Sequence, residues 1–430
     1  MAQKGIREFD AKRIMAQALP AFSDGAFQFE PQQVLIGPET DMKQVEKDNP
    51  WLKKEKLVAK PDQLFGKRGK NNLLYVNKSW DEVQKWIKER MNKKTTIIQT
   101  TGKTTGVLTH FLVERFIPHE KEYYLAITTH RNHDTIHFST KGGVDIESVW
   151  DSVVELDIPI LGEIDEKQII SFLPKELGSE KEQIGRFIIA LYKMLVDYHF
   201  VYLELNPFTL IKDEIVPLDT VAKVDDYASF QCAEKWGKLK FPSPFGLMKT
   251  PEEERVAELD ERTGASLKLT VLNPDGRVWN LVAGGGGSVI FTDTVADLGY
   301  ANELANYGEY SGNPSTELTY EYTKTILDLM TRKKDPKGRP KYLLVGGGIA
   351  NFTDVAKTFT GIIQALEEYK DKLQKTNVKI YVRRGGPNYR EGLENMRKMG
   401  KRIGIPVEVY GPETHMTRIV SMALSEKEAA

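Results

Sequence analysis

Apolar residues recur along the first half of the chain in a pattern that mixes strands with helices. Runs rich in β-branched and aromatic residues predict strands at residues 57–64, 95–100, 107–117, 122–130 and 135–140. Residues 79–92 follow a serine cap, and residues 180–200 carry apolar side chains at helical spacing, so both predict helices. Strands and helices without strict alternation predict an α+β domain.

A proline-rich stretch, LKFPSPFGLMKTPEEE, separates this half from a second rhythm. We place one domain at residues 1–240, a linker at 241–255 and a second domain at 256–430. In the second domain a strand, a glycine-rich turn and a helix follow one another four times, as in NLVAGGGGS and YLLVGGGIA. This repetition predicts an α/β doubly wound parallel sheet of the flavodoxin-like type.

Composition narrows the class of protein. The 430 residues include 60 basic and 61 acidic side chains, a formal net charge of −1, which gives no electrostatic reason to expect nucleic acid as a partner. The single cysteine, Cys232, excludes an internal disulfide and a cysteine-clustered zinc site. No apolar run approaches the roughly 20 residues that span a bilayer, and the N-terminus lacks an apolar signal core. We therefore expect a cytoplasmic, soluble protein that does not act in a membrane.

The glycine turns of the second domain predict an anion site. Backbone amides at the start of a helix, unobstructed by Cβ atoms, attract negative charge. Asn351 and Thr353 stand where the helix after VGGGIAN begins, and Arg383 and Arg384 follow a neighbouring strand at the same sheet edge. Arginine there suits a carboxylate or a phosphate, so we expect a di- or tricarboxylate, a phosphate, or both. The alternative is tight strand–helix packing with an ordinary cap.

The first domain carries residue types that a nucleotide with magnesium needs. The stretch VYLELNPFTLIKDEIVPLDTVAKVDD predicts a hairpin turning at Lys212-Asp213, which sets Asn206 opposite Asp219 as a two-ligand seat for Mg²⁺. Lys60 lies in an apolar strand and needs an anionic partner. The basic loop GKRGKNN suits phosphates, and VERFIP alternates residue types as an adenine slot requires. For the hairpin pair alone, a solvated surface is the alternative.

The order of these motifs resembles a known family. LVAKPDQL, KRGK, VERFIPH, GGVDIE and ELNP resemble the ATP-grasp half of acyl-CoA synthetase β subunits. GASLKLTVLNPDGRVWNLVAGGGGSV, ELANYGEYSGNPSTE, GGGIANFTDVAKTF, YVRRGGPNYREGLENM and GPETHMTRIVSMAL are similar to the N-terminal portion of ATP-citrate lyases. The resemblance covers nearly the whole chain and corresponds to the separate subunit of split enzymes. It extends to the large subunit of citryl-CoA synthetase.

The resemblance implies site residues for each ligand. It implies ATP-binding residues at Lys60, Arg68, Gly69, Arg115, Ile117 and Glu122. It implies magnesium ligands at Asn206 and Asp219, and a further metal-associated segment at Asp260, Thr263 and Ala265. It implies citrate contacts at Gly312, Asn351, Thr353, Tyr369 and Arg384, although helical spacing sets Tyr369 at the far end of its helix. Gly348, where the family often has serine, and Arg115, where some relatives have proline, depart from the pattern.

The resemblance also implies an activity that needs a partner. In the family, ATP phosphorylates a histidine, the phosphoryl group passes to citrate, and coenzyme A attacks citryl phosphate. None of the seven histidines lies in a matching loop, His415 included, so we expect no catalytic residue on this chain. A second subunit would carry the phosphohistidine, the CoA site and a citrate-synthase-like domain that cleaves citryl-CoA to acetyl-CoA and oxaloacetate. The complete enzyme would therefore be a hetero-oligomer.

Three other functions stay open. The chain could be the large subunit of a citryl-CoA synthetase, an acid–thiol ligase that leaves cleavage to a separate lyase. It could be the β subunit of a succinyl- or malyl-CoA synthetase. The paired arginines and Asn351 favour an acid larger than succinate or malate, which argues against this function. It could be a non-catalytic nucleotide-sensing scaffold, but Lys60, Asn206 and Asp219 are all present.

Overall fold

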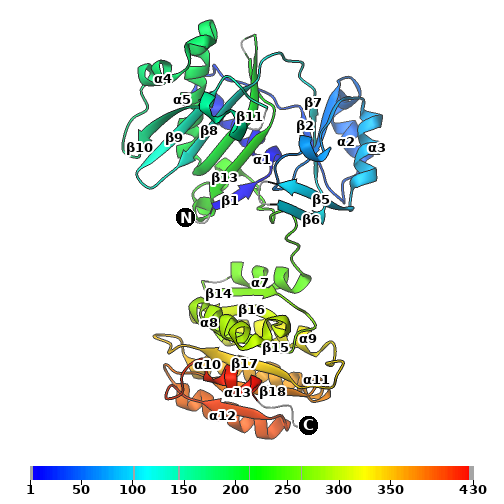
Figure 1. The fold of residues 1–430 in the computed structure, drawn as a ribbon, viewed down its shortest axis with the longest axis vertical. Helices are drawn as coiled ribbons and strands as arrows, with labels where there is room; N and C mark the ends of the chain where they lie inside the picture. Colours follow the sequence, from blue (N-terminus) through cyan, green and yellow to red (C-terminus); the bar gives the residue numbers. More distant parts are fainter. Residues whose placement is uncertain (1–2, 100–101, 144–145, 213, 263, 426–430) are drawn as a thin grey trace. The chain divides into compact units, whose positions relative to one another are not determined.

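The structure, a computed structural model, describes residues 3–99, 102–143, 146–212, 214–262 and 264–425. The chain divides into two compact units, with the boundary between Met248 and Lys249 (Figure 1). None of the helices in the described ranges combines the length and the apolar content that a bilayer crossing needs.

The second unit begins with a helix inside the predicted linker. Helix α7 (Pro251–Glu261) starts at residue 251, so residues 251–255 are helical and their assignment to the linker is wrong. The side chain of Thr250 accepts a hydrogen bond from Glu253 N, and the Glu253 side chain accepts one from Thr250 N. This capping box, with proline at the first helical position, is a helix start signal, which the proline-rich composition obscured.

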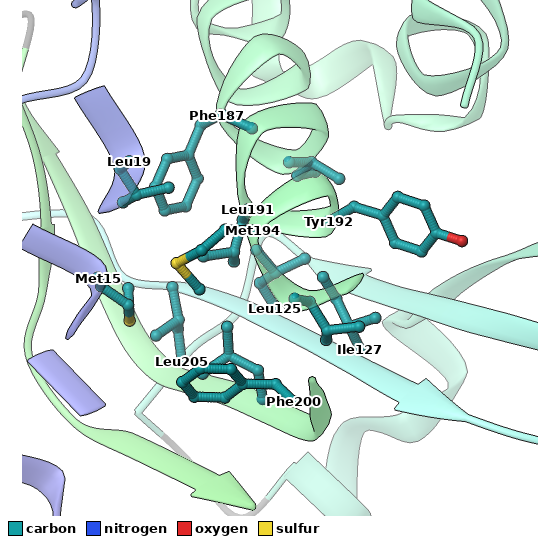
Figure 2. Packing of buried hydrophobic residues seen from close by; sticks show 14 of the residues in the cluster. Met15, Leu19, Leu125, Ile127, Phe187, Leu191, Tyr192, Met194, Phe200 and Leu205 are labelled. Atoms are coloured by element: carbon teal, nitrogen blue, oxygen red, sulfur yellow. The ribbon is translucent and has the colours of Figure 1, made fainter. Parts of the chain in front are cut away.

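A seven-stranded antiparallel sheet forms the larger part of unit 1. Its strands are, in order, β1 (Gln3–Ile6), β13 (Thr220–Asp225), β11 (Phe200–Ile211), β8 (Tyr123–Thr129), β9 (His133–Ser139) and β10 (Val154–Pro159), with β12 (Glu214–Pro217) beside β11. The helices of this part are α1 (Glu8–Phe22), α4 (Glu166–Phe172), α5 (Lys181–Asp197) and α6 (Ala233–Trp236). Figure 2 shows the core between these helices and the sheet, where Leu19 of α1 and Phe187 of α5 lie together above the strands.

A four-stranded sheet forms the rest of unit 1. Its order is β2 (Gln33–Ile36), β7 (Phe111–Arg115), β3 (Leu57–Pro61) and β4 (Tyr75–Lys78), and β5 (Lys94–Gln99) pairs with β6 (Gly102–Val107) in a separate ribbon. Helices α2 (Met42–Asp48) and α3 (Trp80–Arg90) belong to this part. Ser79 caps α3 in a capping box with Glu82, which confirms the predicted helix and its start.

Unit 2 is an α/β unit with helices on both faces of one sheet. The strand order is β14 (Ser266–Val271), β16 (Asn306–Ser311), β15 (Val278–Ala283), β17 (Lys341–Gly347), β18 (Val378–Arg383) and β19 (Val407–Tyr410). One face packs against α7, α9 (Thr316–Thr331), α10 (Val355–Glu368) and α12 (Tyr389–Ile403), and the other against α8 (Gly285–Val295) and α13 (Arg418–Leu424). Helix α11 (Lys370–Lys375) follows α10.

The sheet of unit 2 has strands that the fourfold repetition did not reveal. Neighbours from β16 to β19 run parallel, and β14 pairs with β16 antiparallel. Strand β16 reads NYGEYS, which has no β-branched residue and contains a glycine, so its sequence does not signal a strand. Two buried asparagines hold it in place: Asn306 Oδ1 accepts from Asn280 N at 2.8 Å, and Asn306 Nδ2 donates to Asn280 O at 2.9 Å.

Candidate functional site

A cavity of about 950 Å³ opens in unit 1. Its walls come from β3, the loop after it, the end of β7, and the β11–β12 hairpin. The lining includes every residue that the sequence assigned to ATP and to the hairpin magnesium: Lys60, Arg68, Gly69, Arg115, Ile117, Glu122, Asn206 and Asp219. The fold therefore gathers residues that lie as much as 159 positions apart, from Lys60 to Asp219, around one space.

Lys60 has anionic partners within the protein itself. Its Nζ lies 2.7 Å from Glu8 Oε1 and 3.0 Å from Glu114 Oε1, and it donates to Leu218 O at 2.8 Å. Burial works against the charge, but the carboxylates of Glu114 and Glu8 raise the pKa of Lys60 above its usual value. The prediction that this buried lysine needs an anion is confirmed, although the partner was not identified.

Glu8 is the centre of this buried charge cluster. Its carboxylate lies 2.8 Å from Lys12 Nζ, 2.7 Å from Lys60 Nζ and 3.0 Å from Arg68 Nη1. Burial disfavours its charge, and these three cations hold its pKa well below the usual range. Glu8 and Lys12 lie one turn apart on the buried face of α1. Charged residues at core positions of an amphipathic helix are the signal that could have found them.

Asp62 positions Glu8 by capping α1 from another element. Asp62 Oδ1 accepts from Glu8 N at 2.9 Å, and Asp62 Oδ2 accepts from Phe9 N at 3.1 Å. These are orphan amides of the first turn of α1, whose own N-cap residue, Arg7, provides no side-chain acceptor. Burial and the nearby Glu8 charge raise the pKa of Asp62 to about 6.

Asn206 and Asp219 lie opposite one another, as the hairpin register predicts. Ile211 pairs with Glu214 across the turn, and Asn206 N donates to Asp219 O at 3.0 Å. Asp213, which the turn was predicted to include, lies outside the described residues. Asn206 Oδ1 accepts from Gly143 N at 3.0 Å, and Asp219 Oδ1 lies 2.7 Å from Arg68 Nη1.

The donor set of this pair fits Mg²⁺. One carboxylate and one amide oxygen suit an ion that takes its remaining ligands from water and phosphate. No group of three or more His, Cys, Asp or Glu side chains in the described ranges is arranged to hold a metal. The pair therefore fits a metal that arrives with a phosphate ligand, and does not fit a closed structural site.

His119 joins two of the predicted ATP residues. Its Nδ1 lies 2.7 Å from Ile117 O and its Nε2 lies 2.9 Å from Glu122 Oε1. The imidazole thus holds the strand exit and the Glu122 carboxylate together at the cavity wall. Arg115 at the end of β7 is exposed.

The second cluster lies where the strands of unit 2 end. Arg384 is 5% exposed and donates from Nη1 to Gly348 O at 2.6 Å, and burial lowers its pKa. Gly347 makes room for it: a Cβ on Gly347 would stand 2.8 Å from Arg384 Nη1 and 2.8 Å from Ala283 O, and its φ is +142°. Among the described residues Arg384 has no ion pair with a carboxylate.

Arg383 has a different role from the one the sequence suggested. It donates from Nη1 to Gly347 O at 3.0 Å, from Nε to Thr414 O at 2.8 Å and from Nη2 to Pro412 O at 3.2 Å. Its donors join the end of β17 to the loop between β19 and α13. Only Arg384 of the pair is available for a ligand.

The helix after the glycine turn begins later than predicted. Helix α10 starts at Val355, and its cap is Asp354, which accepts from Lys357 N at 3.0 Å and from Asn388 Nδ2 at 2.8 Å. The expected start at Asn351 and Thr353 is wrong, because aspartate is as strong a cap as asparagine and the apolar face begins at Val355. The Asp354 carboxylate thus already accepts from an amide in the first turn of the helix, where an anion was expected to bind. Asn351 is exposed, and Thr353 is half-buried.

Gly312 and Ala265 lie in contact, whereas Tyr369 lies elsewhere. Gly312 has φ of +75°, and a Cβ on it would stand 3.2 Å from Ala265 Cα. Tyr369 is the C-cap of α10 and is buried in the core, with Lys372 Nζ 4.6 Å from its ring centre. A helix of 14 residues is about 21 Å long, so the structure does not bring Tyr369 to the start of α10, where the sequence grouped it with Asn351.

Asp260 is engaged with its own neighbours. Its Oδ1 accepts from Leu267 N at 2.7 Å and its Oδ2 accepts from Lys268 Nζ at 2.5 Å. Thr263, predicted beside it, lies outside the described residues. Ala265 is half-buried and directly precedes β14.

The sequence matches two family models and several relatives. A model described as the ATP-citrate synthase ATP-grasp domain matches residues 2–236, and one described as ATP citrate lyase citrate-binding matches residues 248–426. ATP-citrate synthase alpha chain protein 2 of Arabidopsis thaliana is 45% identical over 433 aligned positions, and the match covers 100% of this chain and 100% of the relative. ATP-citrate synthase of Bos taurus is 46% identical over 430 aligned positions, and the match covers 99% of this chain but 39% of the relative. The chain thus spans about two fifths of the length of that longer protein.

A solved structure has a similar fold. The structure of ATP citrate lyase from Methanothrix soehngenii in complex with citrate and coenzyme A matches with a TM-score of 0.89 and 52% sequence identity. The match covers 99% of this chain and 100% of that chain.

Proposed function

This chain belongs to the ATP-citrate lyase family, and on that premise we propose that it is the ATP- and citrate-binding subunit of an enzyme that forms citryl-CoA. Citrate, coenzyme A and ATP would react through a phosphohistidine and citryl phosphate, and the partner subunit would cleave citryl-CoA to acetyl-CoA and oxaloacetate. The observation that carries this proposal is Arg384, whose buried guanidinium has no carboxylate partner among the described residues. A buried charge of this kind calls for an anion.

The nucleotide half of the proposal is supported by the cavity of unit 1. Its volume, about 950 Å³, is in the range of small-molecule sites. A triphosphate can replace the protein's own carboxylates as the partner of Lys60 and Arg68. The Asp219 oxygen that faces Arg68 is then available, with Asn206, to hold Mg²⁺. Mg²⁺ there would neutralise phosphate charge. A second metal at Asp260, Thr263 and Ala265 rests on the resemblance alone.

The citrate half is supported by the topology of unit 2. Counted along the chain, the parallel strands lie in the order 2-1-3-4-5, which is the flavodoxin-like order. Ligands of such sheets bind where the order reverses, here between the ends of β15 and β17. Gly348 follows β17, and Arg384 follows β18 and reaches Gly348. We therefore assign citrate to Arg384, Gly312, Asn351 and Thr353, and leave Tyr369 out.

A partner subunit would supply the remaining chemistry. His119 is engaged by Glu122 and Ile117, and His415 is exposed beside Thr417, 3.0 Å away. Neither suits the phosphohistidine, so we assign it and the coenzyme A site to a second chain in a hetero-oligomer. Cys232 is free and buried, which agrees with a reducing cytoplasmic compartment.

Two substitutions test the two-site division. Lys60→Ala should abolish Mg-ATP binding and leave citrate binding intact, and Arg384→Ala should do the reverse, as measured by calorimetry on the purified chain. Arg390→Ala, which removes an exposed arginine near the start of α12, is the matched control and should leave both affinities unchanged. If either substitution weakened both ligands equally, the division would be refuted. Citryl-CoA formation by this chain without a second subunit would refute the partner.

A substrate panel separates this function from the alternatives. Succinate or malate turning over as well as citrate would indicate a succinyl- or malyl-CoA synthetase β subunit. Citryl-CoA that accumulates without cleavage in the presence of the partner would indicate a citryl-CoA synthetase. A non-catalytic scaffold would bind Mg-ATP without supporting any acyl-CoA formation with a partner.

A further inference from the structure

Tyr310 has a buried hydroxyl without a hydrogen-bond partner in the described part of the chain. The residue is 1% exposed, and no donor or acceptor lies within bonding distance of its Oη. Tyr322, whose ring centre lies 6.3 Å away in the same core, shows the usual arrangement, because its hydroxyl donates to Lys268 O at 2.8 Å. Buried hydroxyls without partners are costly and rare in proteins, so the Tyr310 hydroxyl needs an explanation.

Tyr310 lies at the sheet edge where the glycine turns begin. It pairs with Ala283, the last residue of β15, and its carbonyl accepts from Gly284 N at 2.9 Å. Arg384 reaches the same place from β18. Its Nη1 and Ala283 O both stand 2.8 Å from the position that a Cβ on Gly347 would take. The guanidinium therefore extends across Gly347 toward Ala283, the cross-strand partner of Tyr310.

The charge of Arg384 acts on the Tyr310 hydroxyl, and Arg384 has no counter-charge among the described residues. Arg384 uses Nη1 for Gly348 O, and no carboxylate pairs with its guanidinium within the ranges that the structure describes. Burial raises the pKa of Tyr310, although the Arg384 charge opposes the rise, so the hydroxyl keeps its proton and can donate it. A guanidinium and a hydroxyl donor at the same sheet edge can together bind the two oxygens of one carboxylate.

We propose that Tyr310 is a citrate-binding residue, whose hydroxyl donates to an oxygen of the carboxylate that Arg384 binds. The inference rests on the proposed function, which assigns citrate to Arg384, and adds a residue and an orientation to it. One carboxylate of citrate would lie beneath the glycine turn of residues 346–348, between the ends of β16 and β18. The hydroxyl that has no acceptor in the free protein would gain one when citrate binds.

Tyr310→Phe tests the inference because it removes the hydroxyl and leaves the ring. Citrate affinity, measured by calorimetry on the full chain, should fall about tenfold or more, the usual loss for a hydrogen bond to a charged group. The melting temperature without citrate should stay the same or rise, because an unpaired buried hydroxyl is lost. The matched control is Tyr322→Phe, which breaks the bond to Lys268 O. It should lower the melting temperature and leave citrate affinity unchanged.

The outcomes separate this inference from the proposed function. If the unmodified chain bound no citrate, the proposed function would fail and the inference with it. If the unmodified chain bound citrate and Tyr310→Phe bound it equally well, only the inference would be wrong. A melting temperature that fell in Tyr310→Phe as in Tyr322→Phe would show that the hydroxyl has a partner in the free protein, which also overturns the inference.

A second ligand tests which group of citrate is bound. Tricarballylate has the three carboxylates of citrate but lacks its hydroxyl. Tyr310→Phe should weaken tricarballylate by the same factor as citrate. If the loss appeared with citrate alone, Tyr310 would bind the citrate hydroxyl, and the assignment to a carboxylate would be refuted.

Discussion

Replacing Glu8 with glutamine would remove one negative charge from the centre of the buried cluster and change the shape of the side chain very little. The Glu8 side chain is 1% exposed and lies within 3.0 Å of cationic nitrogens of Lys12, Lys60 and Arg68. An amide can accept hydrogen bonds from these groups, but it cannot balance their charge. Breaking a buried ion pair on one side costs about 3–5 kcal/mol, because the partner stays buried without compensation.

The remaining carboxylates set the size of the effect. Glu114 still lies 2.8 Å from Lys12 and 3.0 Å from Lys60, and Asp219 still lies 2.7 Å from Arg68. No cation is left without any partner, so we expect a loss near the lower end of that range, about 3 kcal/mol. The loss should fall on unit 1, which contains the whole cluster.

Urea unfolding followed by tryptophan fluorescence measures this loss. Trp279 is the one tryptophan of six that lies in unit 2, so the signal reports mainly on unit 1. With a urea dependence of about 3 kcal/mol per M, the midpoint of Glu8→Gln should fall by about 1 M. Glu182→Gln is the matched control, because Glu182 pairs with Arg186 and both side chains are exposed, and its midpoint should hardly move. A midpoint for Glu8→Gln equal to that of the unmodified protein would refute the reasoning.

Two further predictions concern the glycine turn and one histidine. Gly346→Ala would place a Cβ 2.3 Å from the Phe291 ring and should lower the free energy of unfolding, measured by thermal unfolding, by about 1–3 kcal/mol. Gly348→Ala is the control, because a Cβ there would meet nothing within 4 Å, and it should lower the free energy of unfolding very little. Equal losses of stability in the two variants would contradict the packing argument. Burial, together with the charges of Arg7 and Lys240, lowers the pKa of His110 from 6.5 to about 4. The unfolded state therefore binds the proton first, so stability should fall as the pH drops from about 6.5 to about 4. His110→Asn should weaken this dependence, and an unchanged pH profile would count against it.

Local patterns predicted the elements that carry strong local signals. The Ser79 cap gave the start of α3, and the spacing of apolar residues gave α5. The hairpin register set Asn206 opposite Asp219, because the side-chain period of two fixes every pair once the turn is known. Strand β16 was not predicted, because a strand in the interior of a sheet can be built from polar residues when tertiary contacts satisfy their hydrogen-bonding groups.

The pairings within the buried charge cluster could not be predicted from local patterns. Glu8 meets Lys60 and Arg68 across 52 and 60 positions of sequence, and Lys12 meets Glu114 across 102. Nothing in the neighbourhood of Lys60 shows which acid will pair with it, because the pairing is made by the packing of α1 against two sheets. A lysine in an apolar strand predicts that it has an anionic partner, but only the fold determines which acidic residue that partner is.

The glycine runs show how an expectation of an anion site can be drawn from the wrong atoms. Three glycines before a helix suggested amides open to an anion, but Gly346 makes room for Phe291, Gly347 makes room for Arg384, and Asp354 caps the helix itself. Of these three glycines, only Gly348 faces open space. The case for an anion at this edge therefore comes from the guanidinium for which Gly347 makes room, and from the buried hydroxyl of Tyr310, which has no partner among the described residues. A side chain whose polar group is buried and unpaired is a stronger sign of a ligand than a backbone free of side chains, because packing alone explains the glycines and does not explain the hydroxyl.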